Sequence, residues 1–374
     1  MTILLTRTPD RTTAIASSTP LVAAGTSATD TRRDEYCPFP LSTDARTFGL
    51  TTSAMRLGSG TVVVRHGRRT DSGTATILLH GAAGSWTTWT PLLSAAALGS
   101  TGSNGSTGRV PSGALALTDL IIPDLPGWGD SEPADASTRH SARPSARPTP
   151  GIATVAASIA ESARALGYER WNVIGHSLGG FLALELAALE PAATVTVALV
   201  SATTFSVVDS VRHPLTRFAL LPGYTALLAV MRALAVVEPA GRGLVRWLGR
   251  VGLLRGLTAP LFSRVDDVPE SVISALATEV RPRAFAAASA LAGAHDPARS
   301  WSRIACPVRA IQGDADVFVA DSDSARLGAV IPGFVSQTIR GTGHFAHIEK
   351  PFAALEALLT PRESTRSALK PRRT

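Results

Sequence analysis

The stretch Gly175-His176-Ser177-Leu178-Gly179 follows Trp171-Asn-Val-Ile174, which reads as a short buried strand, and opens an apolar run typical of a helix. It is a G-x-S-x-G pattern in a strand–turn–helix context. A sharp turn of this kind leaves the residue at its apex strained and exposed, and glycines flank it because side chains there would collide with neighbouring backbone. The helix N-terminus behind Ser177 favours developing negative charge. The stretch therefore predicts a nucleophilic serine at the carboxyl end of a strand.

Strands and helices are expected to alternate on both sides of this turn. Alternation of this kind predicts an α/β fold with a mostly parallel, doubly wound sheet. In such sheets ligands bind at the carboxyl ends of the strands, so the site is expected there. Strands are expected at residues 61–66, 76–79, 120–122, 171–174, 195–200, 308–311 and 335–339, with helices after Ser85, over 152–166 and 178–189, and from Pro351.

Composition divides the chain into an extension, a core and an insertion. The extension is rich in Thr, Ser, Ala and Pro without periodicity, so it is expected to be largely irregular. The insertion has helical runs but no convincing strand and falls between two strands, which predicts a helical cap. Polar stretches at residues 99–113 and 132–150 are predicted to be surface loops. The parts are the extension at residues 1–53, the core at 54–204 and 296–374, and the cap at 205–295.

A nucleophilic serine needs a base that takes its proton and an acid that orients the base. In strand–turn–helix sites of this kind the chain order is serine, acid, histidine. Ser177, Asp316 and His344 meet that order, and His344 lies in Gly341-Thr-Gly-His-Phe345, directly after the last expected strand. We predict these three as the catalytic residues. Of the other nearby histidines, His80 and His176 are interpreted as structural, and His347 is expected beside the following helix.

Two carboxylates compete for the role of the acid, because Asp314 and Asp316 both follow the same strand. The acid must turn inward beneath the histidine, so it is expected within the turn. Asp314 follows Gly313 directly and is better placed to accept backbone N–H bonds that shape the turn. We therefore predict a hydrogen bond between His344 and a carboxylate oxygen of Asp316, which precedes it by 28 residues.

Five motifs in this order resemble those of the α/β-hydrolase family over about residues 54–359. The resemblance implies an oxyanion hole built from the backbone N–H groups of Ala82 and Leu178. It also implies that the acid is the third residue after Gly313, which is Asp316, and that no cofactor or metal takes part. The motifs are HGAAGSWTTW (80–89), DLPGWGDS (124–131), GHSLGG (175–180), IQGDADVFV (311–319) and GTGHFAHIEKP (341–351).

The motifs predict hydrolysis of an ester or related carbonyl compound through an acyl-serine. The cap is rich in Leu, Val and Ala, so an apolar small-molecule substrate is expected, with Trp86, Trp128 and Phe181 beside the catalytic loops as candidate contacts. Carbon–carbon bond hydrolysis, perhydrolysis and acyl transfer use the same three residues and stay open. A non-catalytic binding protein of this fold is disfavoured because all three catalytic residues are present.

Composition restricts the partners and the compartment. The chain has 374 residues, 45% hydrophobic and 17% charged, with a net charge of +7 and a pI near 10.3. The basic residues are scattered arginines without a Lys/Arg block, so no nucleic-acid partner is expected. Cys37 and Cys306 form neither a disulfide framework nor a metal motif. No signal peptide or membrane-spanning run is recognised, and a cytoplasmic protein is expected. The sequence does not predict an oligomeric state.

One cap segment combines positive charge with an apolar stripe. Arg242, Arg246 and Arg250 recur every four residues, and the stripe runs beside them. A basic amphipathic helix of this kind can lie on anionic lipid. The favoured interpretation is that the stripe covers the active-site cleft while the arginines face water. The stripe consists of Leu244, Leu248 and Val251.

Overall fold

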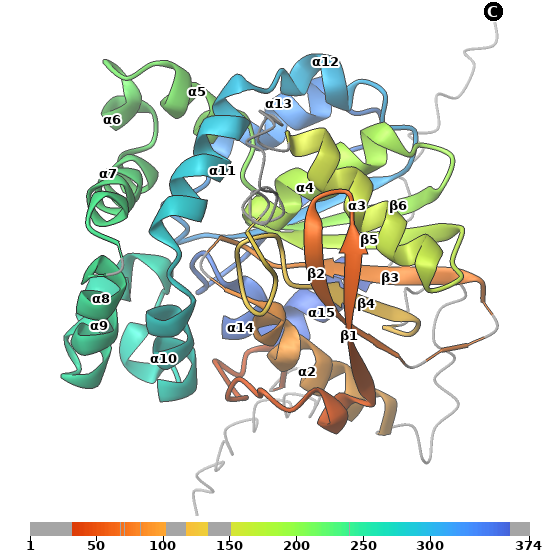
Figure 1. The fold of residues 1–374 in the computed structure, drawn as a ribbon, viewed down its shortest axis with the longest axis horizontal. Coiled ribbons are helices and arrows are strands. Elements are labelled where there is room, and N and C mark those ends of the chain that lie inside the picture. Colours follow the sequence, from red (N-terminus) through yellow and green to blue (C-terminus); the bar gives the residue numbers. More distant parts are fainter. Residues whose placement is uncertain are drawn as a thin grey trace, which may run out of the picture.

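The computed structural model describes residues 32–67, 69–70, 72–82, 84–101, 117–133, 151–238 and 240–359. Its centre is an eight-stranded sheet of order β1-β2-β4-β3-β5-β6-β7-β8 (Figure 1). β2 is antiparallel to both neighbours and the other pairs are parallel, so the predicted mostly parallel α/β sheet is confirmed. The strands are β1 (Leu50–Leu57), β2 (Gly60–Gly67), β3 (Thr74–Leu79), β4 (Leu120–Pro123), β5 (Arg170–His176), β6 (Thr194–Val200), β7 (Val308–Gly313) and β8 (Val335–Ile339).

Neighbouring residues of the central strands point to opposite faces of the sheet, and each face has its own apolar core. Ile77 and Val173 belong to the core under α3 and α4, whereas Leu78 and Ile174 belong to the core under α2, α14 and α15. Both faces are buried, as expected for a sheet of mainly parallel strands. The helices of the two layers are α2 (Thr90–Thr101), α3 (Ile152–Ala165), α4 (Leu178–Leu189), α13 (Asp321–Val330), α14 (Ala346–Glu349) and α15 (Pro351–Leu359), with the 3-10 turns η1 (Ala45–Phe48) and η2 (Trp86–Trp89).

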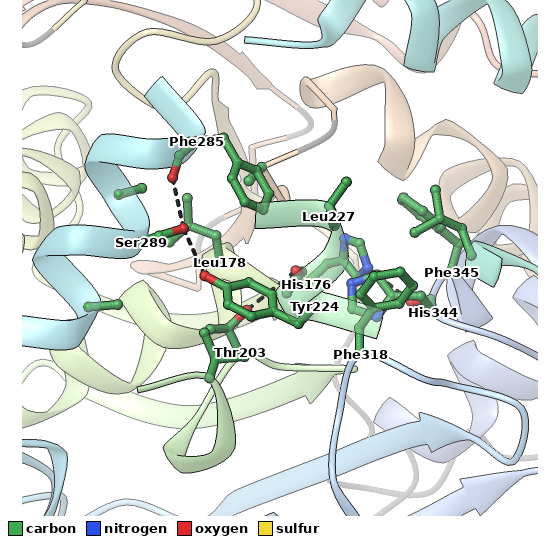
Figure 2. A pocket seen from close by; sticks show the side chains of 16 residues that line it. His176, Leu178, Thr203, Tyr224, Leu227, Phe285, Ser289, Phe318, His344 and Phe345 are labelled. Carbon is green, nitrogen blue, oxygen red and sulfur yellow. Dashed lines mark hydrogen bonds between the residues drawn. The ribbon is translucent and has the colours of Figure 1, made fainter. Parts of the chain in front are cut away.

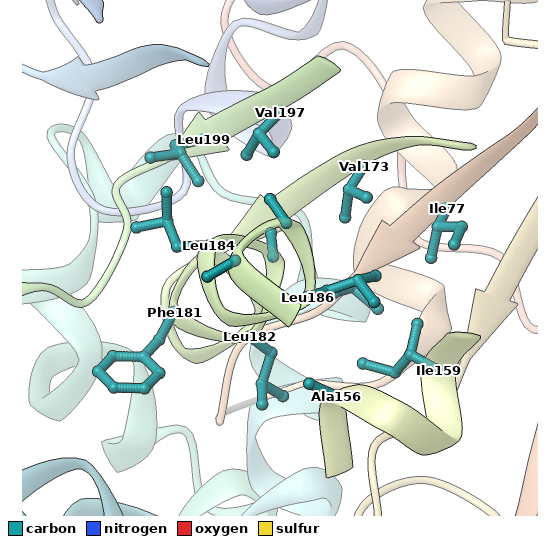
Figure 3. Close-up of a cluster of buried hydrophobic side chains, with 14 of the residues drawn as sticks. Ile77, Ala156, Ile159, Val173, Phe181, Leu182, Leu184, Leu186, Val197 and Leu199 are labelled. Carbon is teal, nitrogen blue, oxygen red and sulfur yellow. The ribbon is translucent and has the colours of Figure 1, made fainter. Parts of the chain in front are cut away.

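Helix α4 lies between the sheet and α3, and its apolar side chains point toward both (Figure 3). All of its residues except Leu189 are buried. A helix that is apolar on every side is stable only when it is surrounded, and α4 packs against α3, β5, β6 and α12. Because α4 begins at Leu178, directly after Ser177, this packing fixes the position of the predicted nucleophile.

Helices fill the chain between β6 and β7 in the described residues, and α6 to α10 lie along one side of the molecule (Figure 1). We call residues 205–295 the cap, as in the sequence prediction. No single helix among the described residues is long and apolar enough to cross a bilayer, and α7 and α8 reach that length and composition only as a pair bent by 120°. The helices are α5 (Phe205–Arg212), α6 (Arg217–Leu220), α7 (Pro222–Val236), α8 (Ala240–Arg250), α9 (Leu253–Thr258), α10 (Glu270–Glu279), α11 (Pro282–Ala294) and α12 (Pro297–Trp301), with η4 (Ala259–Leu261) and η5 (Val265–Asp267).

The described part of the N-terminal segment has little regular structure before Leu50, apart from the η1 turn. β1, which begins at Leu50, was not predicted, because only half of its side chains are apolar and these do not alternate strictly with polar ones. Before it, Cys37 is buried, and its N–H donates to the carbonyl oxygen of Glu349 at 2.7 Å. The described part of the segment therefore packs on the body. Residues 1–31, and most of the two predicted surface loops, lie outside the described residues.

Candidate active site

Ser177 occupies the turn between β5 and α4 with φ 52° and ψ −117°. Such a φ is uncommon for a residue with a β-carbon. Glycines are required on both sides, since a β-carbon at Gly175 would lie 2.3 Å from the Gly179 carbonyl oxygen and one at Gly179 would lie 2.1 Å from the Leu79 carbonyl oxygen. The Ser177 N–H donates to the Val200 carbonyl oxygen at 3.0 Å, and this bond joins the turn to β6. The turn thus holds Ser177, partly exposed, at the carboxyl edge of the sheet.

His344 is bound by both carboxylate oxygens of Asp316. Its Nδ1 lies 3.1 Å from Oδ1 and 3.0 Å from Oδ2, and the two side chains are 8% and 1% exposed. The Phe318 N–H donates to Oδ1 at 2.8 Å, and the Phe318 ring lies 5.1 Å from the imidazole. Burial acts to raise the pKa of Asp316, but the adjacent His344 and the hydrogen bonds to the carboxylate outweigh it and hold the pKa below its ordinary value. The predicted hydrogen bond is confirmed.

Asp314 holds the loop that carries the histidine. Its Oδ1 accepts the N–H of Gly341 at 2.7 Å and that of Thr342 at 3.3 Å. Asp314 is exposed and makes no hydrogen bond to His344 among the described residues. The contacts therefore assign the two carboxylates as predicted, with Asp314 shaping the turn and Asp316 binding the imidazole.

The Ser177 hydroxyl lies 3.4 Å from Thr203 Oγ1, which is the only hydrogen bond that its Oγ makes within the described residues. Ser177 and His344 line the same cavity, but no hydrogen bond joins their side chains. Bonds of this type are often long in free enzymes and tighten with substrate. Sequence reasoning missed Thr203, although it follows β6 at the carboxyl edge where ligands bind, and that position could have identified it.

Two backbone N–H groups near Ser177, those of Leu178 and Ala82, have no acceptor among the described residues. The Ala82 loop approaches closely, since a β-carbon at Gly81 would lie 2.9 Å from Ser177 Cβ. The Trp128 indole N–H donates to the Ala82 carbonyl oxygen at 2.7 Å and ties this loop to the segment after β4. A pair of free N–H groups beside a nucleophile can bind an oxygen that gains negative charge during a reaction.

The cavity that contains Ser177 and His344 is small, about 50 Å³, and mainly apolar. We call it the Ser177 cavity. The Tyr224 hydroxyl donates to Ser289 at 2.7 Å, and Ser289 donates to the Phe285 carbonyl oxygen at 2.8 Å, so these polar groups satisfy one another (Figure 2). Burial raises the pKa of Tyr224 to about 12. Other lining residues include Val207, Leu227, Ala288 and Phe318.

Comparison with known proteins agrees with this geometry. The sequence profile of the Alpha/beta hydrolase family matches residues 76–358, well over half of the 374-residue chain. The chain belongs to the alpha/beta hydrolase family. Uncharacterized proteins of Mycobacterium tuberculosis and Mycobacterium bovis are 27% identical to this hydrolase over 284 residues, covering 75% of it and 72% of each relative.

Solved structures resemble this hydrolase in fold at low sequence identity. A serine hydrolase from Cycloclasticus zankles is 17% identical with a TM-score of 0.55, covering 82% of this chain and 96% of its own. A hydrolase from Pseudomonas aeruginosa is 17% identical with a TM-score of 0.58 and the same two coverages, 82% and 96%. An esterase from Exiguobacterium antarcticum is 14% identical with a TM-score of 0.54, covering 79% and 94%.

Two aromatic side chains predicted to contact substrate do not line the Ser177 cavity of the hydrolase. Trp86 is 4% exposed, and the Arg65 guanidinium lies 5.1 Å from its ring. Phe181 is fully buried on α4, where its ring meets Trp301 edge to face at 5.3 Å. Both were chosen for their closeness in sequence to the motifs, but their side chains point into the cores. Their predicted role in substrate binding is therefore not supported.

Trp128, the third predicted contact, lines a second and larger cavity of about 590 Å³ between the cap and the core. Leu178 and Ala288 line both this cavity and the Ser177 cavity, so the two spaces are neighbours. Trp128 is 4% exposed and bonded to Ala82, as described above. Its contacts thus place it beside the Ala82 loop and outside the Ser177 cavity.

The histidines predicted to be structural connect the loops of the hydrolase. His80 Nε2 accepts the Leu125 N–H at 2.9 Å, so its Nδ1 carries the proton and donates to the Gly81 carbonyl oxygen at 2.8 Å. His176 Nε2 donates to the His344 carbonyl oxygen at 3.0 Å. Burial lowers the pKa of both His80 and His176, so both rings are neutral. His80 joins the Ala82 loop to the segment after β4, and His176 supports the backbone of the predicted base.

Glu349 is a second residue that sequence reasoning missed. It is fully buried, and its carboxylate accepts the Gly343 N–H at 2.8 Å, the Ser263 N–H at 2.8 Å and the Tyr36 hydroxyl at 2.9 Å. Burial raises its pKa, while these hydrogen bonds oppose the rise. Glu349 therefore joins the His344 loop to the cap and to the N-terminal segment. No sequence signal marks it, because two of its partners, Ser263 and Tyr36, lie far away in the chain.

The described residues contain no group of three or more His, Cys, Asp or Glu side chains that could hold a metal ion. Cys37 and Cys306 are free and buried. The chemistry that this site can support therefore has to be argued from Ser177, His344, Asp316 and the two backbone N–H groups.

Proposed function

We propose that this chain is a serine hydrolase that cleaves small apolar esters through an acyl-serine intermediate. The observation that carries the proposal is the shared cavity, which is lined by Ser177, by the Asp316-bound His344, and by Ala82 and Leu178. In an ester hydrolysis the Ser177 oxygen attacks the carbonyl carbon while its proton passes to His344 Nε2. Asp316 accepts the Nδ1–H bond, which keeps Nε2 free to take that proton.

The tetrahedral intermediate would place its negative oxygen near the backbone N–H groups of Ala82 and Leu178. Removing one such donor typically costs about 10²–10³ in rate. Collapse expels the alcohol, which takes the proton from His344. Water, deprotonated by the same imidazole, then attacks the acyl carbon and releases the acid and Ser177. The proton and the bonds balance over the cycle without a cofactor.

The size of the Ser177 cavity supports a short acyl chain. One water needs roughly 10–15 Å³ of space measured in this way, so the cavity of about 50 Å³ would hold a few atoms of comparable size. Its lining by Val207, Leu227, Phe285 and Phe318 favours apolar groups over charged or sugar esters. A series of p-nitrophenyl esters from acetate to dodecanoate is expected to give the highest kcat/KM at the short end.

Labelling with a fluorophosphonate tests the proposal directly. We expect one equivalent of probe on Ser177 in the full chain, and no label or ester turnover in Ser177→Ala. The serine is partly exposed, so its truncation leaves no core cavity and Tm should be unchanged. A folded protein that neither reacts with the probe nor turns over any ester would favour a non-catalytic binding role.

Acyl transfer is distinguished from hydrolysis by adding an alcohol to the ester assay. Hydrolysis predicts the free acid as the main product, whereas an acyltransferase would form the new ester in preference. The cytoplasmic location expected from the sequence remains a prediction, which fractionation of cells expressing the full chain would test.

A further inference from the structure

Exposed large apolar side chains are concentrated on the cap. Eleven of the fifteen such side chains in the described residues lie between Leu215 and Leu257, in and around α6, α7, α8 and α9. These helices lie along one outer side of the molecule (Figure 1). Single exposed apolar residues are ordinary, but a concentration on one face indicates an interaction surface. The residues, which we call the outer cap face, are Leu215, Phe218, Leu220, Val230, Val236, Val237, Leu244, Trp247, Val251, Leu253 and Leu257.

Helix α8 and the residue that follows it show how this surface arises. Leu244, Trp247 and Val251 follow a spacing that places them on one side, and they are 49%, 51% and 48% exposed. The side buried against the rest of the cap carries Gly241 and Val245 instead. Leu248, the third residue of the predicted stripe, is partly buried and packs beside Val245 on the core of the cap, and none of the three lines either cavity described above. The expectation that the stripe covers the active-site cleft is therefore wrong, and Leu244 and Val251 face outward.

The outer cap face is positively charged. Residues 215–257 contain six arginines and one acidic residue, Glu238, which pairs with Arg283 at 3.2 Å. Arg232, Arg246 and Arg250 are exposed and make no ion pair with any described residue. Arg242 differs from them, since it lines the larger cavity. Apolar side chains and free arginines thus occur together on the same helices.

We propose that the outer cap face docks on the surface of an anionic phospholipid bilayer. Exposed Trp, Leu and Phe side chains can enter the headgroup boundary while arginines contact phosphate groups. A second copy of this chain fits less well, because a two-fold contact would bring this positive surface against itself. The inference does not depend on the proposed ester hydrolysis.

Docking in this way would bring the Ser177 cavity close to the lipid. Helix α7 carries exposed Val230 and Val236 and also carries Tyr224 and Leu227, which line that cavity. At α7 a single helix therefore separates the outer cap face from the Ser177 cavity, so compounds that partition into the bilayer would reach the cavity over a short path.

Trp247 provides a specific probe of docking. The chain has six tryptophans, and the other five are at most 4% exposed, whereas Trp247 is 51% exposed. Iodide should therefore quench Trp247 selectively in the free full-length protein. Vesicles of equal parts phosphatidylcholine and phosphatidylglycerol should protect it, and brominated acyl chains should then quench it. Phosphatidylcholine vesicles alone should have a weaker effect, and Trp247→Phe should bind but lose both signals.

Arg246→Gln/Arg250→Gln tests the contribution of charge by vesicle sedimentation. The partition coefficient should fall about fivefold for each arginine, or roughly 30-fold for the pair. The matched control is Arg56→Gln/Arg170→Gln, which changes two exposed arginines of β1 and β5 and should bind like the parent. Leu244→Ser/Leu257→Ser should also weaken binding. Ester turnover or Tm reports the folding of each variant.

Three outcomes would overturn the proposal. Equal losses in the two arginine pairs would show that only net charge matters. Protection of Trp247 from iodide before vesicles are added would show that another part of the chain covers the surface. Protection that grows with protein concentration in the absence of vesicles would identify a second copy as the occupant. Failure of ester hydrolysis with intact vesicle binding would refute only the proposed function.

Discussion

Replacing Asp316 by Asn tests the arrangement of the site most directly, because the replacement changes almost no volume. In the structure Oδ1 accepts the Phe318 N–H at 2.8 Å, while Oδ2 lies 3.0 Å from His344 Nδ1. An amide must keep its oxygen toward Phe318, since its NH₂ group cannot accept a hydrogen bond. The NH₂ group then faces Nδ1 and donates to it. This arrangement stabilises the tautomer whose proton sits on Nε2, where the base should be free.

The expected loss follows from that tautomer. A histidine held in the wrong tautomer by this substitution costs about 10⁴ in kcat, which is about 5.4 kcal/mol of barrier. We would measure kcat with p-nitrophenyl acetate, together with Tm. Asp314→Asn is the matched control. It weakens two bonds to the backbone of the His344 loop, so it should lower Tm and leave kcat within about tenfold.

The reasoning fails if Asp316→Asn retains more than a tenth of parental kcat while folded. It also fails if Asp314→Asn loses activity to the same extent as Asp316→Asn, because the two carboxylates would then not be distinguished by their contacts. Restoration of activity at higher pH would indicate that the lost group acted only through its charge.

Three further predictions concern buried groups outside the reacting atoms. Burial lowers the pKa of His347 to about 3, so the folded ring stays neutral while the unfolded ring gains a proton below about pH 6.5. Stability should fall as pH drops from about 6.5 toward 3, and His347→Phe should reduce that slope by about 1.4 kcal/mol per pH unit in urea unfolding. Equal slopes for parent and variant would contradict it. Burial raises the pKa of Cys37 to about 12 and that of Cys306 to about 11, so neither should react with a disulfide reagent at pH 8 before unfolding; labelling of the native chain would refute this. Glu349→Ala leaves three donors without an acceptor, so it should lower the free energy of unfolding by about 3 kcal/mol. It should also lower kcat more than it changes KM. Tyr36→Phe removes only one of these bonds and should lower the free energy of unfolding by about 1 kcal/mol. Equal effects of these two substitutions would show that Glu349 does not organise the His344 loop.

The site could be predicted wherever local geometry restricts the sequence. A β-carbon at either Gly175 or Gly179 would lie 2.1–2.3 Å from a backbone oxygen, so only glycine fits at these two positions. The motif itself therefore indicates the turn. Asp314 and Asp316 follow Gly313 at different positions in the sequence, and that difference determines which of them shapes the turn. Each of these statements depends on a few neighbouring residues and on the rule that ligands bind at the carboxyl edge.

The remaining errors concern the direction in which a side chain points. Phe181 lies on a helix buried on almost every side, so its sequence does not indicate which side faces the cavity. In α8 the predicted apolar stripe was expected to pack inward, but only Leu248 does so, beside Val245. Glu349 was missed because two of its three partners, Ser263 and Tyr36, come from distant segments. Orientation of this kind is decided by tertiary contacts that no local pattern contains.

The three-way junction at Glu349 also has a consequence for the order in which the protein is made. Its partner Tyr36 lies 313 residues earlier in the chain, so this contact cannot form before Glu349 has been synthesised. The Ser177 turn, by contrast, needs only strands and a helix that emerge by Val200. Contacts between such distant segments form late and slowly. A growing chain would therefore form the Ser177 turn long before the His344 loop gains the support of Glu349, so the proposed activity would first appear after both segments have been synthesised and have packed together.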